Sequence, residues 1–209
     1  MLRLSMPART PASPLALAVL SLLEVGPLHP YGLQRLIRLW GKDTVVNVGQ
    51  RASLYKTIAR LQRAGLIAVR HTERDQRFPE RTVYELTDEG RRQRREWLEE
   101  MVSTPRNEFP RFPAALSFAM LLGPGDLLTL LERRAVALRE QVAALDRELA
   151  DYGHLPRVTL IESEYQCAVV AAELAWVDAV VADLRSGELT WSAEELASLA
   201  AADAGEGEG

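Results

Sequence analysis

Apolar side chains recur at helical spacing in three successive segments near the start of the chain. The first two segments begin with residues that favour helix starts, such as the Ser13-Pro14 pair, and all three end at or just before a glycine. The three segments run from Ser13 to Gly26, from His29 to Gly41, and over residues 50–64. The pattern therefore predicts three consecutive helices.

A period-two pattern follows the third segment. Two short runs rich in β-branched and aromatic residues occupy residues 66–71 and 81–86, and residues 72–80 between them are polar and rich in arginine. This predicts a β-hairpin with a charged tip. Thr87 then offers a helix cap with two acids behind it, and opens a helix that reaches about Val102. Three helices, a two-stranded wing and a fourth helix make a winged helix-turn-helix.

The second half of the chain shows no strand pattern, and we expect helices at 113–122, 124–152, 158–185 and 192–202. In the longest, apolar residues alternate three- and four-residue steps, which is typical of coiled coils. This seam consists of Leu128, Leu131, Ala135, Leu138, Val142, Leu145, Leu149 and Tyr152. Either a second copy of the chain or the helix at 158–185 must cover it.

The helix at 158–185 carries a broad apolar band in which many side chains are small enough for close helix approach. The band consists of Ile161, Tyr165, Ala168, Val169, Ala172, Trp176, Ala179 and Val180. Together the patterns predict a mainly α protein. We expect a winged-helix DNA-binding domain at 13–105, an all-α dimerisation or sensor domain at 111–202, and loose tails at 1–12 and 203–209.

Charge separates the two halves of this 209-residue chain. Residues 1–106 hold 18 Lys and Arg against 11 Asp and Glu, a net +7, whereas residues 107–209 have a net charge of −11. A basic first half suggests a polyanionic partner. The single cysteine, Cys167, cannot form an internal disulfide, and no apolar run approaches the ~20 residues that span a bilayer. We therefore expect a cytoplasmic protein.

The third predicted helix has the features of a DNA-reading helix. Leu54, Ile58 and Leu61 form its core stripe, and cations and small residues lie opposite, which suits close approach to a major groove ~12 Å wide. The wing would lie over flanking phosphates or the minor groove. The candidate DNA contacts are Arg51, Ser53, Tyr55, Lys56, Arg60 and Arg63 on the helix, and Arg70, His71, Arg74 and Arg77 on the wing, with Arg81 nearby.

Three segments in this order, residues 23–33, 52–67 and 81–90, resemble PadR-type regulators, and the resemblance covers residues 15–102. It implies a homodimer that binds a palindromic operator, often as a repressor, and often releases it when a small effector binds. It also implies that Tyr55 contacts a phosphate. The chain departs from the usual pattern at Pro30, Ala52 and Lys56, so no operator sequence is carried over.

The resemblance to the longer PadR subfamily extends to the helical second half, whose helices build the dimer there. The apolar seam independently supports dimerisation, through Leu128, Leu131, Leu138, Val142, Leu145 and Leu149, unless the helix at 158–185 covers it. The resemblance also suggests that Trp97 stacks on a flat aromatic effector, although packing in the core is the alternative. The aromatic residues Trp40 and Trp176 are expected to serve the core.

No catalytic, metal or cofactor site is indicated. The sequence lacks a nucleophile elbow, a phosphate-binding glycine loop and metal-ligand spacing among its three histidines and Cys167. Cys167 is expected to be a small buried hydrophobe, with a redox-sensing thiol as the alternative. Two other functions remain open: a winged-helix module for protein contacts or small-molecule sensing that does not bind DNA, and an enzyme that uses a C-terminal cavity.

Overall fold

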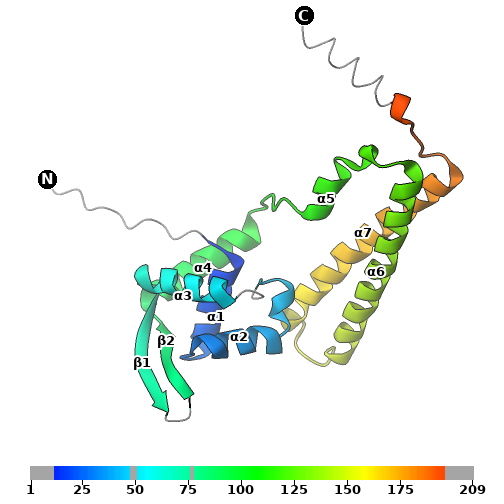
Figure 1. Ribbon diagram of the computed structural model, residues 1–209. Coiled ribbons are helices and arrows are strands. Elements are labelled where there is room, and N and C mark those ends of the chain that lie inside the picture. Colours follow the sequence, from blue (N-terminus) through cyan, green and yellow to red (C-terminus); the bar gives the residue numbers. More distant parts are fainter. Residues whose placement is uncertain (1–11, 48–50, 76–77, 196–209) are drawn as a thin grey trace, which may run out of the picture. The chain divides into compact units, whose positions relative to one another are not determined.

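The computed structural model describes residues 12–47, 51–75 and 78–195, and they belong to two compact units, residues 1–107 and 108–209 (Figure 1). Most of both predicted tails lies outside the described residues. The helix expected at 192–202 is described only at its start. There the backbone N–H groups of Ser192 and Glu195 each donate to the other's side chain, which is a capping box.

The first unit begins with the helices that the sequence predicts. Helix α1 (Pro14–Val25) starts where the Ser13 hydroxyl accepts the N–H of Ala16, 3.2 Å away. Helix α2 (Pro30–Leu39) starts where Nδ1 of His29 accepts the N–H of Gly32. A left-handed glycine at residue 41 and the short turn η1 (Lys42–Thr44) lead towards α3 (Arg51–Arg63). The predicted helix caps are thus confirmed.

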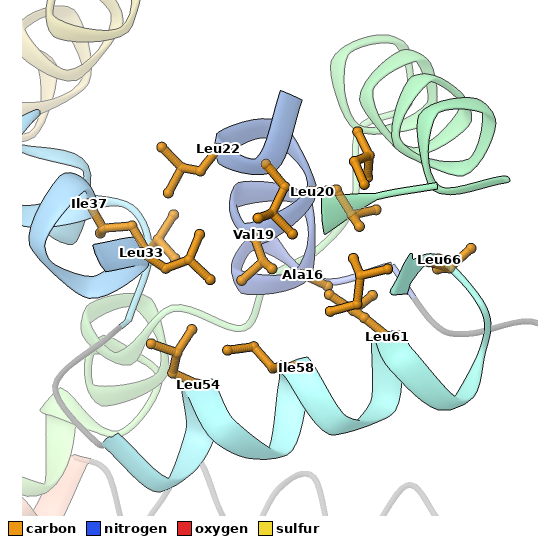
Figure 2. Close-up of a cluster of buried hydrophobic side chains, with 14 of the residues drawn as sticks. Ala16, Val19, Leu20, Leu22, Leu33, Ile37, Leu54, Ile58, Leu61 and Leu66 are labelled. Carbon is orange, nitrogen blue, oxygen red and sulfur yellow. The ribbon is translucent and has the colours of Figure 1, made fainter. Parts of the chain in front are cut away.

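The core of the first unit lies between α1, α2 and α3, as Figure 2 shows. Leu54, Ile58 and Leu61, the predicted stripe of α3, are buried against α1 and confirm the face that the sequence assigns to the core. Fully buried side chains from α1 and α2 complete the cluster, among them Leu20 and Leu33. The core therefore fixes which face of α3 points outward.

The wing is an antiparallel hairpin of β1 (Ile67–Asp75) and β2 (Phe78–Leu86). The sequence prediction of strands at 66–71 and 81–86 was too short, because the ladder continues into the arginine-rich segment. Backbone pairing needs no apolar side chains, so a polar strand pair forms where periodicity gives no signal. Leu28 adds a bridge to Tyr84 through two backbone hydrogen bonds of 3.0 and 2.9 Å, which ties the wing to the start of α2.

Helix α4 (Asp88–Ser103) packs closely on the base of the wing. The Thr87 hydroxyl caps it by accepting the N–H of Gly90, and shares its own proton between the carbonyls of Gly65 and Leu66, 2.8 and 3.0 Å away. Gly90 lies so near that carbonyl that a Cβ atom would come within 2.0 Å of it. Glycine at this position therefore permits the contact between α4 and the hairpin.

The second unit is built on two long antiparallel helices, α6 (Pro124–Asp151) and α7 (Ile161–Ser186) (Figure 1). Leu131, Ala135, Leu138 and Leu145 of the predicted seam are buried in a core shared with α7, while the others are partly buried or, like Tyr152, exposed. Ion pairs such as Arg139–Asp178 and Arg185–Glu132 flank the core. Of the two expected partners, the helix of the same chain covers this seam.

The turn between α6 and α7 is fixed at η3 (Arg157–Thr159), which precedes a helix that begins three residues later than predicted. Arg157 makes a double hydrogen bond to Glu164 in the first turn of α7, and this holds the pKa of the Glu164 carboxyl below its ordinary value. The guanidinium thereby ties the connecting loop to the start of α7.

The single helix predicted at 113–122 is wrong. The structure has α5 (Arg111–Leu116) and, after a break, the short turn η2 (Ala119–Leu121). Pro124 has no N–H, so a continuous helix would leave the Met120 carbonyl without its partner four residues on. Instead the indole N–H of Trp191 donates to the carbonyls of Met120 and Leu122, at 3.1 and 3.0 Å.

Candidate nucleic-acid interface

The outer face of α3 is open to solvent along its length. We define this face by Ala52, Lys56, Ala59 and Arg63, all exposed and opposite the buried stripe. Tyr55 beside them is 56% exposed and Ser53 is half-buried at the edge. Among the described residues Lys56 has no ion-pair or hydrogen-bond partner, and Arg63 donates only to a carbonyl of its own helix. The face thus presents cations and a hydroxyl beside two small residues.

Arg60 behaves differently from its neighbours on α3. Its Nη2 donates to the hydroxyl of Ser13 at 3.3 Å, and its Nε is buried without a partner. The side chain is half-buried and links α3 to the N-terminal end of α1. The sequence grouped Arg60 with the DNA contacts; the structure gives it a partner within the protein that residue spacing could not reveal.

The wing carries the second group of candidate residues. Arg70 and His71 are exposed on β1, and Arg70 faces Glu85 of β2 at 3.7 Å across the ladder. Arg77 lies outside the described residues, as do the side chains of Arg51, Arg74 and Arg81. The described part of the wing therefore adds two candidate residues, Arg70 and His71, and the carboxylate of Glu85 moderates the charge of the first.

Several arginines of α4 pair with carboxylates on α1 or on α4 itself, so they add little to the positive surface of the first unit. Arg91 and Arg94 both face Glu24 of α1, at 3.8 and 3.5 Å. Arg92 pairs with Glu89, and Arg95 with Glu99 at 2.8 Å. Opposite charges this close largely cancel at a distance. The net positive charge is therefore carried by other residues, including those on the outer face of α3.

The aromatic candidates divide between core and surface. Trp97 is 3% exposed within the first unit's core, which favours the packing alternative over stacking on an effector. Trp40 and Trp176, expected to pack in a core or an interface, are 47% and 45% exposed, so neither is buried in the core of its unit. Trp176 touches the edge of Phe112, whose ring also faces the guanidinium of Arg134. These contacts hold α5 on the helical pair.

Cys167 lies on α7 with its thiol 3.4 Å from Oδ1 of Asp146 on α6. Desolvation, and then the hydrogen bond and negative charge of Asp146, raise the pKa of this thiol above its ordinary value. A raised pKa lowers the fraction of reactive thiolate at neutral pH.

Among the described residues no group of His, Cys, Asp and Glu could hold a metal ion. Within the same residues, no helix combines the length and apolar character that a bilayer requires.

The side of α7 that faces away from α6 is apolar and largely exposed within the second unit, with Phe112 of α5 in contact with Trp176. At about 100° per residue, Ile161 and Tyr165 lie opposite the buried Val170, Val177 and Val181. Val169 and Trp176 lie on the flank of this exposed side. Three of the small residues of the predicted band, Ala168, Ala172 and Ala179, are exposed among them. We call these seven residues the outer face of α7. Most of the predicted band thus faces away from α6.

Comparisons with known proteins agree with this geometry. The model of the Transcriptional regulator PadR-like family matches residues 19–96, which span α1 to α4. No curated protein sequence matches significantly. Among solved structures, Bacillus subtilis PadR in complex with operator DNA is 17% identical with a TM-score of 0.65, and covers 81% of this chain and 98% of its own.

Two further structures show the same fold over both units. Bacillus subtilis PadR in complex with p-coumaric acid is 16% identical with a TM-score of 0.61, over 84% of this chain and 99% of its own. The Vibrio cholerae virulence activator AphA is 18% identical with a TM-score of 0.58, over 82% and 98%. The winged helix-turn-helix at residues 19–96 thus matches the PadR-like family of transcriptional regulators, and the fold of both units resembles that of solved PadR structures.

Proposed function

We propose that this chain binds double-stranded DNA in a sequence-dependent way, with the outer face of α3 in the major groove. The observation that carries the proposal is the exposed row of Ala52, Lys56, Ala59 and Arg63 on a helix whose other side is locked in the core. Small residues permit close approach to base edges, and the cations reach bases or phosphates. Tyr55 adds a hydroxyl for a flanking phosphate.

The wing supplies the second contact. Arg70 and His71, with Arg74 and Arg77, would meet phosphates beside the groove and add affinity that falls with salt. Arg51 at the start of α3 would add a further cation. The solved PadR–operator complex of similar fold supports this arrangement. A module that only docks proteins needs no exposed cation such as Lys56 beside small residues on one helix face, and the rival function predicts no preference among duplexes.

Selection of bound fragments from random DNA, followed by titration of the best duplex over a series of salt concentrations, tests the proposal. Lys56→Ala should weaken binding and lower the salt slope by about 1, the value for one lost phosphate contact. Arg92→Ala is the matched control, because it removes the same charge from a paired site on α4. If no duplex is enriched, or if both variants behave like the parent, the proposal fails.

We further propose that two copies assemble through the outer face of α7. This side is continuous, apolar and rich in alanine, whereas the predicted α6 seam is covered by α7 within the chain. Two heads held together would place two α3 helices in successive major grooves, about 10 base pairs apart. Direct dimerisation through Leu128, Leu131, Leu138, Val142, Leu145 and Leu149 remains a prediction from the sequence.

Light scattering of variants locates the interface. Tyr165→Asp with Trp176→Asp should convert the dimer to a monomer, because each would place a charge within an apolar contact. Val136→Asp, at an exposed site of α6 outside this face, should leave the dimer intact. A parent chain that is monomeric, or a dimer that survives both substitutions, would reject this interface.

We propose that the dimer represses transcription by occupying a palindromic operator, and that a small effector releases it. The PadR structure with p-coumaric acid supports a search among small aromatic acids. A change in the distance or angle between the two heads would weaken their joint engagement with DNA. A reporter whose expression falls when the chain is present, and recovers with the effector, is the expected result.

A further inference from the structure

Helix α2 carries two arginines on its outer side that have no partner. Tyr31, Arg35 and Arg38 are exposed and lie within about 60° of one another around the helix. The buried Leu33 and Ile37 are at least about 100° away from them. Within the described part of the chain neither guanidinium makes an ion pair or a hydrogen bond, and α2 itself contains no aspartate or glutamate. We call Tyr31, Arg35 and Arg38 the outer face of α2.

The unpaired cations of the first unit gather on two helices. The four arginines at 91–95 all face carboxylates, and so does Arg70 on the wing. Among the lysine and arginine side chains that the structure describes in this unit, those of Arg35, Arg38 and Lys56 make no ion pair or hydrogen bond. Lys56 belongs to the outer face of α3, so the free charge stands on the two helices of the helix-turn-helix. Such cations can meet a polyanion without first giving up an ion pair.

The position of α2 places its outer face beside the groove assigned to α3. Helix α2 packs against α3 through the shared core, as Figure 2 shows, and the hydrogen bonds between Leu28 and Tyr84 tie its start to the wing. A helix packed across a reading helix in this way crosses the DNA backbone. From Tyr31 to Arg38 the face runs about 10 Å along α2. One DNA strand carries a phosphate about every 3.4 Å along the duplex axis, so the two guanidiniums can meet separate phosphates.

We infer that the outer face of α2 binds phosphates of the DNA strand at the edge of the groove that α3 enters. Arg35 and Arg38 supply charged donors and the Tyr31 hydroxyl a neutral one. The ring of His29, held by its bond to the N–H of Gly32, stacks on that of Tyr31 with 6.0 Å between centroids and restrains the phenol. The inference rests on the proposed function, because it requires α3 to lie in a major groove. None of the DNA contacts expected from the sequence lies on α2.

Titration of the selected duplex over a series of salt concentrations compares the parent with the double variant Arg35→Ala and Arg38→Ala. Loss of two phosphate contacts should weaken binding at low salt on the order of tenfold or more and lower the salt slope by about 2. The double variant should still select the same DNA sequence, because phosphate contacts carry no sequence information. Its thermal unfolding should match that of the parent, since neither side chain has a partner to lose.

A matched control and a second measurement locate the contact. Arg92→Ala with Arg95→Ala removes the same two charges from sites that are paired within α4, and should bind close to the parent. Ethylation interference on the selected duplex identifies the phosphates that binding requires. Phosphates at the groove edge whose ethylation weakens the parent should no longer matter in the α2 double variant.

The outcomes separate the outer face of α2 from the proposed function. If the parent binds a preferred duplex and Lys56→Ala weakens it, but the α2 double variant keeps the parent's affinity and salt slope, the phosphate contact is refuted and the proposed function stands. A changed sequence preference, an unchanged salt slope, or a control that loses as much affinity also refutes it. If the parent binds no duplex, the proposed function falls and this inference falls with it.

Discussion

Substitution of Gly90 by alanine tests the close contact between α4 and the wing. An added Cβ would lie 2.0 Å from the carbonyl oxygen of Leu66 and 2.7 Å from Cδ1 of Leu86. Real Cβ atoms essentially never come within 3.0 Å of another atom, so α4 must move by about 1 Å. The Leu66 carbonyl cannot yield freely, because it accepts a hydrogen bond from the N–H of Thr87 and shares the Thr87 hydroxyl with the carbonyl of Gly65.

The size of the effect follows from two opposing contributions. Overpacking costs about 1–3 kcal/mol, and contact with backbone falls at the upper end or beyond. Alanine recovers about 1 kcal/mol through its better helix propensity. We therefore expect a net loss of about 2 kcal/mol, which for a domain of this size lowers Tm by about 8–16 °C.

Thermal unfolding together with hydrogen exchange of peptides from residues 67–103 measures this loss in the first unit. Gly125→Ala is the matched control, because a Cβ at this position in α6 meets nothing within 4 Å. The control should be neutral or slightly stabilising. A Gly90→Ala chain as stable as the parent, or a control that loses as much, would refute the reasoning.

Three further predictions concern single contacts. Alkylation of Cys167 should reach its half-maximal rate at a pH above that of an ordinary thiol, since its pKa is raised, and Asp146→Asn should accelerate it at pH 8; equal rates would contradict this. His29→Ala should lower the free energy of unfolding by about 1 kcal/mol in urea titrations, with His29→Asn retaining most of it, because the side chain caps α2. Trp191→Phe should speed amide exchange near η2 and cost about 1 kcal/mol, since two carbonyls lose their donor; unchanged exchange would argue against this role.

Local signals in the sequence were sufficient for the helices of the first unit and for the outer face of α3. Ser13 and Thr87 were identified as caps because a cap acts within three residues of itself, and both hydrogen bonds are present. The stripe of α3 was identified because burial repeats with the helical period. Exposure of Lys56 and Arg63 follows directly from that stripe.

Features that depend on distant residues could not be predicted in this way. Arg60 and Ser13 are 47 positions apart, so nothing near Arg60 indicates that its guanidinium reaches a helix cap. The helical spacing on α6 demanded a partner helix, but the spacing alone cannot distinguish α7 of the same chain from a second copy. The wing was underestimated because its outer ladder pairs polar residues, which alternate no more clearly than those of a loop.

A hydroxyl-radical footprint on the selected duplex tests most directly whether two α3 helices read DNA together. The account predicts two protected half-sites on one face of the duplex, about 10 base pairs apart, and both should weaken together in Lys56→Ala. A single protected site, or no protection at salt concentrations where the chain is folded, would contradict it.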